Sequence, residues 1–373
     1  MLYKLKDIFD LQMGKTPSRN NIEYWNTNDY KWVSIADLTK TDKYIYDTKE
    51  YLSKKAVNES GIKIIPANTV IMSFKLSIGK TAITAEDMYS NEAIMAFHDK
   101  HIVEILPEYI FYLFKYKNWD DGSNKAVMGK TLNKAILSEV EIDICSIEEQ
   151  RKIVNVLDKI MNLISARKKE LSYLDTFTKA RFVEMFGDPV INSKNLLVVT
   201  LGELSELITK GASPCWQGFS YTDDSSQTLF ITSENIREGY IDLSSPKYIE
   251  DGFNEKQRRS VIRKGDFLIN IVGASIGRAA QFNLDCKANM NQAAALVRVK
   301  DNRIKNKYLL IYLNSDRAKR MYDSMKSDTG RANLSLQDIS DLNILLPAVD
   351  KQIEFENFVA QVDKSKLQKF SAA

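Results

Sequence analysis

The 373-residue chain has only three cysteines and two histidines. Cys145, Cys215 and Cys286 are far apart and odd in number, which argues against a disulfide framework. His98 and His101 share the segment FHDKH without a third ligand nearby, so this pair is typical of surface residues rather than of a metal site. We therefore expect no metal site, and catalysis that depends on several histidines is excluded.

The sequence also lacks a long apolar run and a strong charge of one sign. No apolar stretch approaches the roughly 18 residues of a membrane span, and the N-terminal MLYKLKDIFD has no signal segment. We therefore expect a cytoplasmic protein. With 52 basic and 49 acidic residues, the net charge of +3 does not indicate nucleic-acid binding, so such a function would need local patches or a partner's charge.

Motifs of nucleotide-dependent enzymes are missing as well. SIGKT from Ser77 and MGKT from Met128 have the end of a phosphate-binding loop, but Phe74 and Asn124 stand where its first glycine belongs. No GxGxxG opens a helix after a strand, and no Asn-Pro-Pro-aromatic or Asp-Pro-Pro-aromatic segment of an amino-methyltransferase is found. We expect no cofactor in this chain.

The chain contains an internal repeat. Its length of 373 residues suggests two or three domains. LKDIFDLQMGKTP from Leu5 matches LGELSELITKGASP from Leu201, with Gly14 against Gly211 and Pro17 against Pro214. The later matches are WVSIADL with FITSENI, SIGK with SIGR, NEAIMAF with NQAAALV, PEYIFYLF with NKYLLIYL, and GKTLNKAILSEVEIDI with GRANLSLQDISDLNILL. The chain is therefore two copies of one globular unit.

Each copy ends in a strand-like run followed by a helix that begins with an acid-x-Gln segment. These segments are SIEEQRKIVNVLDKI from Ser146 and AVDKQIEFENFVAQVDK from Ala348. The first helix should end at Gly187, before Pro189. We predict a globular unit at 1–146, a spacer helix at 147–186, a second unit at 187–348 and a shortened helix at 349–373. Strands with segregated helices, such as the one predicted from Asn306 to Met325, indicate an α+β fold.

The two helices carry apolar residues at alternating spacings of three and four, which is typical of a helix-pair seam. The seam residues are Ile153, Leu157, Ile160, Ile164, Leu171 and Leu174 in the first helix and Phe355, Val359 and Val362 in the second. A long helix needs its apolar stripe covered, so we predict an antiparallel coiled coil of the two helices. The alternative is that each helix packs on its own domain.

One spacing of acidic residues is compatible with an enzyme, a metal-dependent nuclease. A metal-dependent nuclease needs an acid followed by acid-x-Lys, and Asp266 with Asp285 and Lys287 fits that loose spacing. In the first copy, Asp7 or Asp10 followed by Asp29 and Lys31 fits the same spacing. The two matches fall at non-equivalent places in the copies, which a shared active site should not do. A protein-interaction scaffold without DNA binding is the second alternative.

These features together resemble the DNA-specificity subunit of type I restriction-modification systems. The resemblance rests on the twice-repeated order of WVSIADL and FITSENI, SIGK and SIGR, NEAIMAF and NQAAALV, and the acid-x-Gln helix start. It covers nearly the whole chain. It implies two target-recognition domains held apart by two antiparallel helices, each domain recognising one half of a split target in double-stranded DNA.

The resemblance also implies partners. Such a subunit is not itself an enzyme and assembles with two adenine methyltransferase (modification) subunits and with restriction subunits that translocate and cleave DNA. S-adenosylmethionine, ATP and Mg are then cofactors of those partners. The second helix, from about Val349 to Phe370, is shorter than the family's pattern requires.

Candidate DNA contacts follow from chemistry, because amide and cationic side chains on exposed loops contact bases and phosphates. In the first copy they are Lys15, Thr16, Ser18, Arg19, Lys75, Ser77, Lys80, Lys125, Lys130 and Asn133. In the second copy they are Lys210, Ser213, Gln217, Asn235, Ser275, Arg278, Lys326, Arg331 and Asn333. Trp32 and Phe230 are expected in the core, and Gly79 and Gly277 in tight turns.

Overall fold

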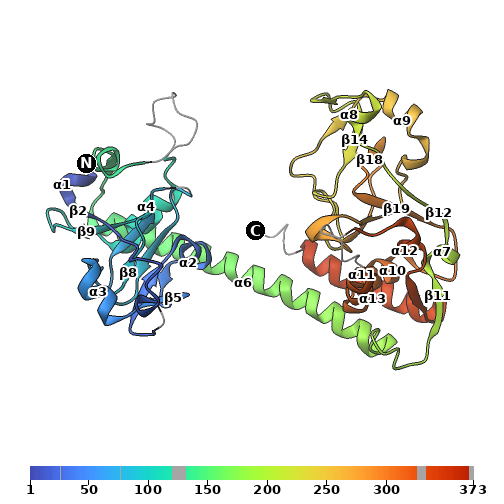
Figure 1. The fold of residues 1–373 in the computed structure, drawn as a ribbon, viewed down its shortest axis with the longest axis horizontal. Helices are drawn as coiled ribbons and strands as arrows, with labels where there is room; N and C mark the ends of the chain where they lie inside the picture. Colours follow the sequence, from blue (N-terminus) through green and yellow to red (C-terminus); the bar gives the residue numbers. More distant parts are fainter. Residues whose placement is uncertain (26, 76, 120–131, 326–332, 369–373) are drawn as a thin grey trace. The chain divides into compact units, whose positions relative to one another are not determined.

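The computed structural model describes residues 1–25, 27–75, 77–119, 132–325 and 333–368. The chain divides into two compact units, Met1–Arg167 (unit 1) and Lys168–Ala373 (unit 2). The 40-residue helix α6 (Ile147–Phe186) belongs partly to each unit and has the bounds that the sequence predicts (Figure 1).

Unit 1 is a mixture of short strands and helices, most of them fewer than eight residues long. Its strands are β1 (Leu2–Lys4), β2 (Phe9–Met13), β3 (Tyr30–Val33), β4 (Tyr44–Ile45), β5 (Glu50–Leu52), β6 (Val70–Ser73), β7 (Thr81–Thr84), β8 (Tyr89–Ser90), β9 (Ile94–Asp99) and β10 (Glu141–Asp143). Its helices before α6 are α1 (Leu5–Ile8), η1 (Ile22–Tyr24), α2 (Ile35–Lys40), α3 (Lys54–Ser60), α4 (Pro107–Tyr116) and α5 (Lys134–Ser138).

Unit 2 has the same mixed character. Its strands are β11 (Leu197–Thr200), β12 (Ser205–Lys210), β13 (Tyr221–Thr222), β14 (Thr228–Ile231), β15 (Tyr248–Ile249), β16 (Phe267–Asn270), β17 (Ala279–Gln281), β18 (Ala288–Met290), β19 (Ala294–Val299) and β20 (Asn343–Leu346). Its helices after α6 are α7 (Leu201–Leu204), α8 (Pro214–Gln217), α9 (Gly252–Lys256), η2 (Arg258–Ser260), η3 (Gly273–Ser275), α10 (Asn306–Leu313), α11 (Asp316–Met325), α12 (Leu336–Ser340) and α13 (Val349–Gln368).

The sheets of the two units correspond, except that β4 of unit 1 and β13 of unit 2 have no counterpart in the described residues. The order β2-β9-β6-β7-β4 in unit 1 matches β12-β19-β16-β17 in unit 2, and β5-β3-β8 matches the β15-β14-β18 part of a four-stranded sheet. Both smaller sheets contain one parallel pair, β3 with β8 and β14 with β18. The strand pair β1-β10 likewise matches β11-β20. The predicted α+β fold with an internal repeat is therefore confirmed.

The central strands are buried on both faces, because successive side chains of a strand point in opposite directions. In β16, Phe267 and Ile269 join one hydrophobic cluster, and Leu268 joins another on the opposite face. β6 divides in the same way, with Val70 and Met72 in one cluster and Ile71 in a second. Each unit therefore has its own core.

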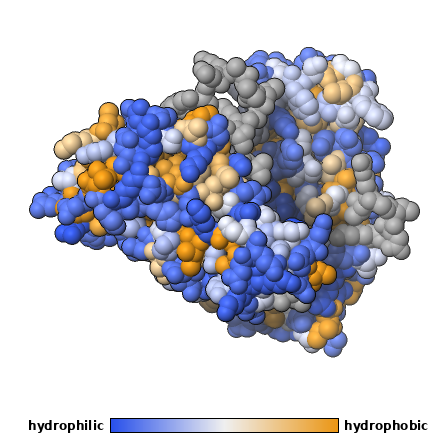
Figure 2. Space-filling model, turned by 60° about the vertical axis from the view of Figure 1, so that its left-hand side comes forward, coloured by the Kyte–Doolittle hydropathy of each residue, from blue (hydrophilic) through white to orange (hydrophobic). Residues whose placement is uncertain are grey.

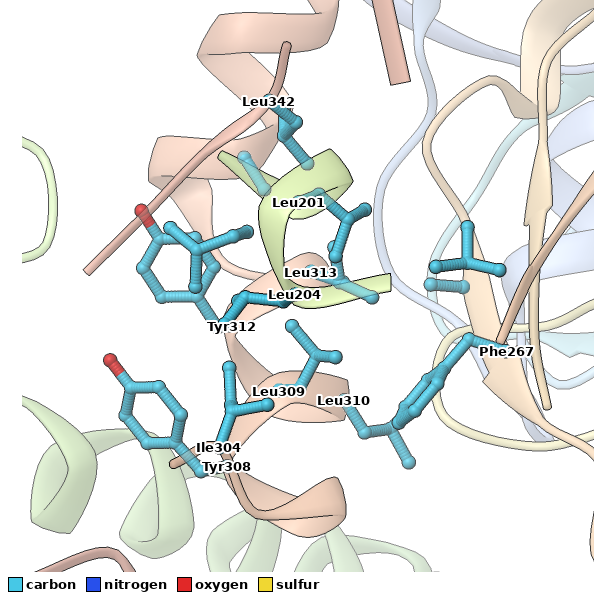
Figure 3. Close-up of a cluster of buried hydrophobic side chains, with 14 of the residues drawn as sticks. Leu201, Leu204, Phe267, Ile304, Tyr308, Leu309, Leu310, Tyr312, Leu313 and Leu342 are labelled. Carbon is cyan, nitrogen blue, oxygen red and sulfur yellow. The ribbon is translucent and has the colours of Figure 1, made fainter. Parts of the chain in front are cut away.

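Figure 3 shows how helices close the largest cluster of unit 2. Leu201 and Leu204 of α7 and Leu309 and Leu313 of α10 are all fully buried there (Figure 3). Tyr308 and Tyr312 of α10 are also buried, and their hydroxyls donate hydrogen bonds to the carbonyls of Leu345 (2.7 Å) and Asn343 (2.9 Å). Because these donors are satisfied, two large polar side chains can lie in an apolar core.

One predicted helix is interrupted. The spacing predicts a single helix from Asn306 to Met325, but α10 ends at Leu313 and α11 starts at Asp316. The amide nitrogen of Asn314 donates to the carbonyls of Leu310 and Ala279, both at 2.9 Å, and its oxygen accepts from the Ala279 N–H. An asparagine that bonds the neighbouring strand in this way competes with helix continuation.

The repeated glutamine of the helix starts is buried in both units. Gln150 is fully buried, and its amide nitrogen donates to the carbonyls of Glu104 (2.9 Å) and Cys145 (3.0 Å). Its oxygen accepts from the Leu106 N–H at 2.9 Å. Gln352 does the same in unit 2 with the carbonyls of Arg303 and Pro347 and the N–H of Lys305. The glutamine therefore fixes each long helix to the loop before α4 or α10.

In unit 2, α13 and the last part of α6 run antiparallel. Phe182 and Phe186 contact Phe355 with ring centroids 5.5 and 5.4 Å apart, and Phe177 contacts Phe358 at 5.2 Å. The ion pairs Arg181–Glu354 (3.1 Å) and Asp175–Lys366 (2.6 Å) continue the pairing in the same sense. As residue numbers rise along α6 they fall along α13, as in an antiparallel pair.

The seam residues of the first half of α6 lie differently from the prediction. Ile153 and Leu157 pack on the core of unit 1, while Ile160 and Ile164 are 45% and 43% exposed. The ring contacts and ion pairs between the two helices join residues 175–186 to residues 354–366, because α13 has 20 residues against 40 in α6. Leu171 and Leu174 are half-buried, and Phe355, Val359 and Val362 are buried.

Among the described residues, no helix is both long and apolar enough to span a bilayer. On the face drawn in Figure 2, hydrophobic residues form separate patches within a mainly hydrophilic surface. Cys145, Cys215 and Cys286 are free thiols.

Candidate nucleic-acid interface

Four segments of unit 2 meet where the strands of its main sheet end. A Cβ on Gly211 would collide with the carbonyl oxygen of Met290, so only glycine allows this approach. The Ile271 N–H donates to the Ala293 carbonyl at 3.0 Å, and the Leu334 N–H donates to the Ile271 carbonyl at 2.9 Å. These bonds bring together the segments 211–213, 271–278, 290–293 and 333–334.

Unit 1 assembles the equivalent loops with the equivalent bonds. A Cβ on Gly14 would collide with the Asn91 carbonyl, and the Lys15 N–H donates to the Ser90 carbonyl at 2.8 Å. The Phe74 N–H donates to the Ala93 carbonyl at 3.0 Å, as Ile271 does in unit 2. Two of the loops chosen from the sequence, after Gly14 and after Phe74, therefore lie against the same segment 90–93 in unit 1, as their counterparts lie against 290–293 in unit 2.

The SIGK and SIGR segments form the same tight turn. Gly79 has φ +88° and donates to the Ser73 carbonyl at 3.0 Å, and Gly277 has φ +86° and donates to the Asn270 carbonyl at 2.9 Å. Positive φ favours glycine, as the sequence predicts for both positions. Trp32 (2% exposed) and Phe230 (fully buried) lie in the core.

The cationic candidates of unit 1 that the structure describes already have partners within the chain. Lys15 Nζ donates to the Ser60 carbonyl, and Lys80 Nζ donates to Thr39 Oγ1 at 2.6 Å. Lys75 lies over the Phe74 ring with its Nζ 5.2 Å from the ring centroid. Arg19 is the most constrained, as described next, so a DNA contact by any of these residues would exchange an existing interaction for a new one.

Arg19 is held from two sides. Its guanidinium lies over the Trp25 ring, 3.8 Å from the centroid, and over Trp32 at 4.8 Å. It also pairs with both carboxylate oxygens of Glu50, with Nη2 and Oε2 3.1 Å apart. Cation–π contact and a bidentate ion pair together keep this charge folded back on unit 1.

The remaining polar candidates of unit 1 are mostly exposed. Ser18 and Ser77 lie at the surface, and Thr16 donates to the carboxylate of Glu92. Asn133 is exposed and caps α5 by accepting from the Ile136 N–H at 2.8 Å. Lys125, Lys130, Lys326 and Arg331 lie outside the described residues.

The candidate DNA-contact side chains of unit 2 differ in exposure, since some lie at the surface and others are half-buried or buried. Lys210 and Asn333 are exposed, and Ser213 and Arg278 are half-buried. Ser275 Oγ accepts from the Asn270 side chain at 3.1 Å. Gln217 is held by α9, as its carbonyl accepts from Lys256 at 2.9 Å and its Oε1 accepts from Gln257 at 3.1 Å.

Asn235 is buried, although the sequence predicts it as a DNA contact on an exposed loop. Its side chain is 6% exposed, and its oxygen accepts from both the N–H and the hydroxyl of Thr232 at 2.9 Å. Its amide nitrogen donates to the Asp242 carbonyl at 3.0 Å. Asn235 thus closes the segment 232–242 and supports the fold instead of presenting an amide at the surface.

The residues of the nuclease pattern have structural partners. Asp266 is 2% exposed, and both of its carboxylate oxygens accept from Arg298, at 2.8 and 2.6 Å. The hydrogen bond that Arg298 donates to Asp266 raises the pKa of the Arg298 guanidinium above its ordinary value. Lys287 pairs with Asp251, not with Asp266 or Asp285. Within the part of the chain that is described, no group of three or more His, Cys, Asp or Glu side chains could hold a metal ion.

Comparison with known proteins gives one family. The model of the type I restriction modification DNA specificity domain matches residues 1–173 and 194–369. The MjaIX specificity subunit of Methanocaldococcus jannaschii is 33% identical over 213 residues, which are 56% of this chain and 48% of that protein. The EcoR124I/EcoR124II specificity subunit of Escherichia coli is 27% identical over 159 residues, 41% of this chain and 39% of that protein. The chain spans about half the length of the curated relatives it matches.

Solved structures share the fold. A chain from a type I R-M system, studied for its complex assembly and conformational transition, has a TM-score of 0.56 at 17% identity and covers 100% of this chain and 91% of that one. The S subunit of the type I system of M. genitalium has a TM-score of 0.51 at 14% identity, with the same coverage. Because the family model matches both halves of the repeat, the chain belongs to the type I restriction modification DNA specificity family.

Proposed function

We propose that this chain is the DNA-recognition subunit of a type I restriction-modification complex and has no catalytic role of its own. Each unit recognises one half of a split target in double-stranded DNA. The chain directs two adenine methyltransferase subunits and the restriction subunits to that target. S-adenosylmethionine, ATP and Mg serve those partners.

The observation that carries the proposal is the repeated loop cluster. Two units with the same topology each bring equivalent loops together, while the side chains on those loops differ, such as Lys15 against Ala212 and Arg19 against Trp216. A constant scaffold with variable loops suits the reading of two different half-sites, because function concentrates on loops positioned by a rigid scaffold. The near-neutral charge is consistent with a partner that supplies much of the phosphate contact.

A surface for such a partner is present on α6. Val156, Ile160, Leu163 and Ile164 are 43% to 65% exposed. Ile160 lies four residues after Val156, and Leu163 and Ile164 lie three and four residues after Ile160, so the four side chains form one apolar stripe. We propose that a methyltransferase subunit covers this stripe. The same observation favours the scaffold alternative, in which the helix binds partners and DNA is not involved.

Co-purification with the presumed methyltransferase, followed by sequencing of methylated adenines in host DNA, tests the proposal. We expect a bipartite methylation motif that disappears when this chain is deleted. Replacing residues 1–146 by those of a relative should change one half of the motif and leave the other. A complex that forms without any motif would favour the scaffold, and Mg-dependent cleavage by the isolated chain, abolished by Asp285→Ala, would favour the nuclease.

A further inference from the structure

Trp216 occupies an unusual position on unit 2. It is 88% exposed, more than any other large hydrophobic side chain that the structure describes. It stands on the short helix α8, between the buried Pro214 and Gly218, which has φ +81° and closes the turn by donating to the Cys215 carbonyl at 3.2 Å. A tryptophan side chain usually buries about 150–250 Å². The exposed indole on this tight turn therefore indicates a surface that a binding partner covers.

A cationic side chain contacts the residue that follows this tryptophan, and two more cations follow in the sequence. Lys256 Nζ donates to the carbonyl of Gln217, the residue after Trp216, and Gln257 donates to the same glutamine's Oε1. α8 and α9 are therefore joined, as Figure 1 also shows. Arg258 and Arg259 follow in η2, and both are exposed.

These arginines are free of carboxylate partners in the described part of the chain. Arg258 Nε donates to the Glu255 carbonyl at 3.1 Å, which leaves its terminal nitrogens open, and the Arg259 side chain has no partner there. Three of the four residues 256–259 are thus exposed cations. Guanidinium groups bind phosphate oxygens in a bidentate way, and an apolar indole can contact the exposed base edges of a duplex, above all thymine methyl groups.

The equivalent surface of unit 1 is closed by its own side chains. Arg19 stands two residues after Pro17, as Trp216 stands two residues after Pro214, and it is folded on Trp25 and paired with Glu50. Lys55 of α3 pairs with Glu23, and this hydrogen bond lowers the pKa of the Glu23 carboxyl. The open aromatic and cationic surface is therefore a feature of unit 2.

We propose that α8, α9 and η2 form a DNA-contact surface of unit 2, the Trp216 surface. In it Lys256, Arg258 and Arg259 bind phosphates, and the indole of Trp216 contacts the bases of the half-site that unit 2 recognises. This inference rests on the proposed function, since it assigns residues to one of the two half-sites. It adds residues outside those that the loops of the repeat suggest.

The test uses the full chain assembled with its methyltransferase and a duplex carrying the target identified by methylation sequencing. Arg258→Ala with Arg259→Ala should lower the slope of log K against log salt by about 1.8, since each phosphate contact contributes about 0.9. The control is Lys300→Ala with Arg303→Ala, in which Arg303, unlike Arg258 and Arg259, pairs with a carboxylate, that of Asp301 at 2.6 Å. These two exposed cations follow β19, at the opposite end of the β12–β19 pair from Lys210, and the control should keep the wild-type slope.

Trp216→Ala should weaken binding to the target about tenfold, while Trp216→Phe should retain most of the affinity, because phenylalanine keeps an apolar ring against the base edges. Methylation sequencing with Trp216→Ala should show degeneracy in one half of the motif alone. Because these side chains are exposed, thermal unfolding of all variants should match the wild type.

The outcomes separate the two proposals. If the wild-type complex binds no target and directs no methylation, the proposed function fails. If the wild type binds while the Trp216, Arg258 and Arg259 variants behave like the control, the Trp216 surface is overturned and DNA recognition stands.

Discussion

The side-chain oxygen of Gln352 accepts a hydrogen bond of 2.7 Å from the backbone N–H of Lys305, and Gln150 makes the same bond with Leu106 at 2.9 Å. Each glutamine connects the first turn of a long helix to a loop more than forty residues earlier in the chain. No partner other than a neutral amide supplies two donors and an acceptor in this space. The repeated acid-x-Gln segment is therefore a structural anchor of the fold.

Gln352→Met should lower the free energy of unfolding of unit 2 by about 3 kcal/mol, because one N–H and two carbonyls lose their partner in the interior. Urea denaturation of the full chain measures the change. Gln361→Met is the control, since Gln361 is exposed on the same helix and its replacement should change stability by less than about 0.5 kcal/mol. Equal effects of the two substitutions would contradict the anchor.

Phe355→Ala should destabilise unit 2 by about 4 kcal/mol, as expected for a fully buried aromatic side chain whose removal leaves a cavity. Phe355 is fully buried and contacts Phe182 and Phe186 of α6. Phe177, on the same helix pair but 55% exposed, provides the control Phe177→Ala with a much smaller effect. Thermal unfolding followed by circular dichroism distinguishes them.

Arg298→Met should cost about 3 kcal/mol, because it leaves the carboxylate of Asp266 buried without its partner. Adding Asp266→Asn should restore part of that loss, since a neutral amide is less costly to bury than an unpaired charge. The double-mutant cycle gives the coupling between the two residues. A double variant no more stable than Arg298→Met alone would argue against the ion pair as the cause.

Inserting four residues after Arg167 should widen the gap between the two halves of the methylation motif by about one or two base pairs. Four helical residues add about 6 Å, against 3.4 Å for each step of the duplex. Sequencing of methylated adenines measures the gap, and both half-sites should stay the same. An unchanged gap with intact methylation would show that α6 does not set the spacing.

The sequence predicts the organisation well and the surface poorly. The repeat, the α+β class and the bounds of α6 follow from matched motifs and from Gly187, which has φ +80° and ends the helix. The seam in the first half of α6 is the main error, because Ile153 and Leu157 have a spacing that suits a partner helix and a domain core equally. Periodicity gives the apolar face of a helix, but not what that face contacts.

Single side chains on loops were harder still. The amide of Asn235 is buried because Thr232 and Asp242 surround it, and Arg19 is neutralised by Glu50, a residue 31 positions away. Trp216 was missed because tryptophan is usually buried, and only its exposure of 88% distinguishes it from Trp32. These surroundings depend on residues that are distant in the sequence, so residue type and local spacing do not predict them.

The division of α6 between two units has a consequence for the order in which the protein matures on the ribosome. Residues 147–167 complete unit 1 as soon as they are synthesised, but Phe182 and Phe186 belong to a core that also needs Phe355. Both rings also contact Tyr308 of α10, so the second half of this helix stays only partly covered until translation has reached α13. A chaperone that binds exposed aromatic segments would find its target here during that interval.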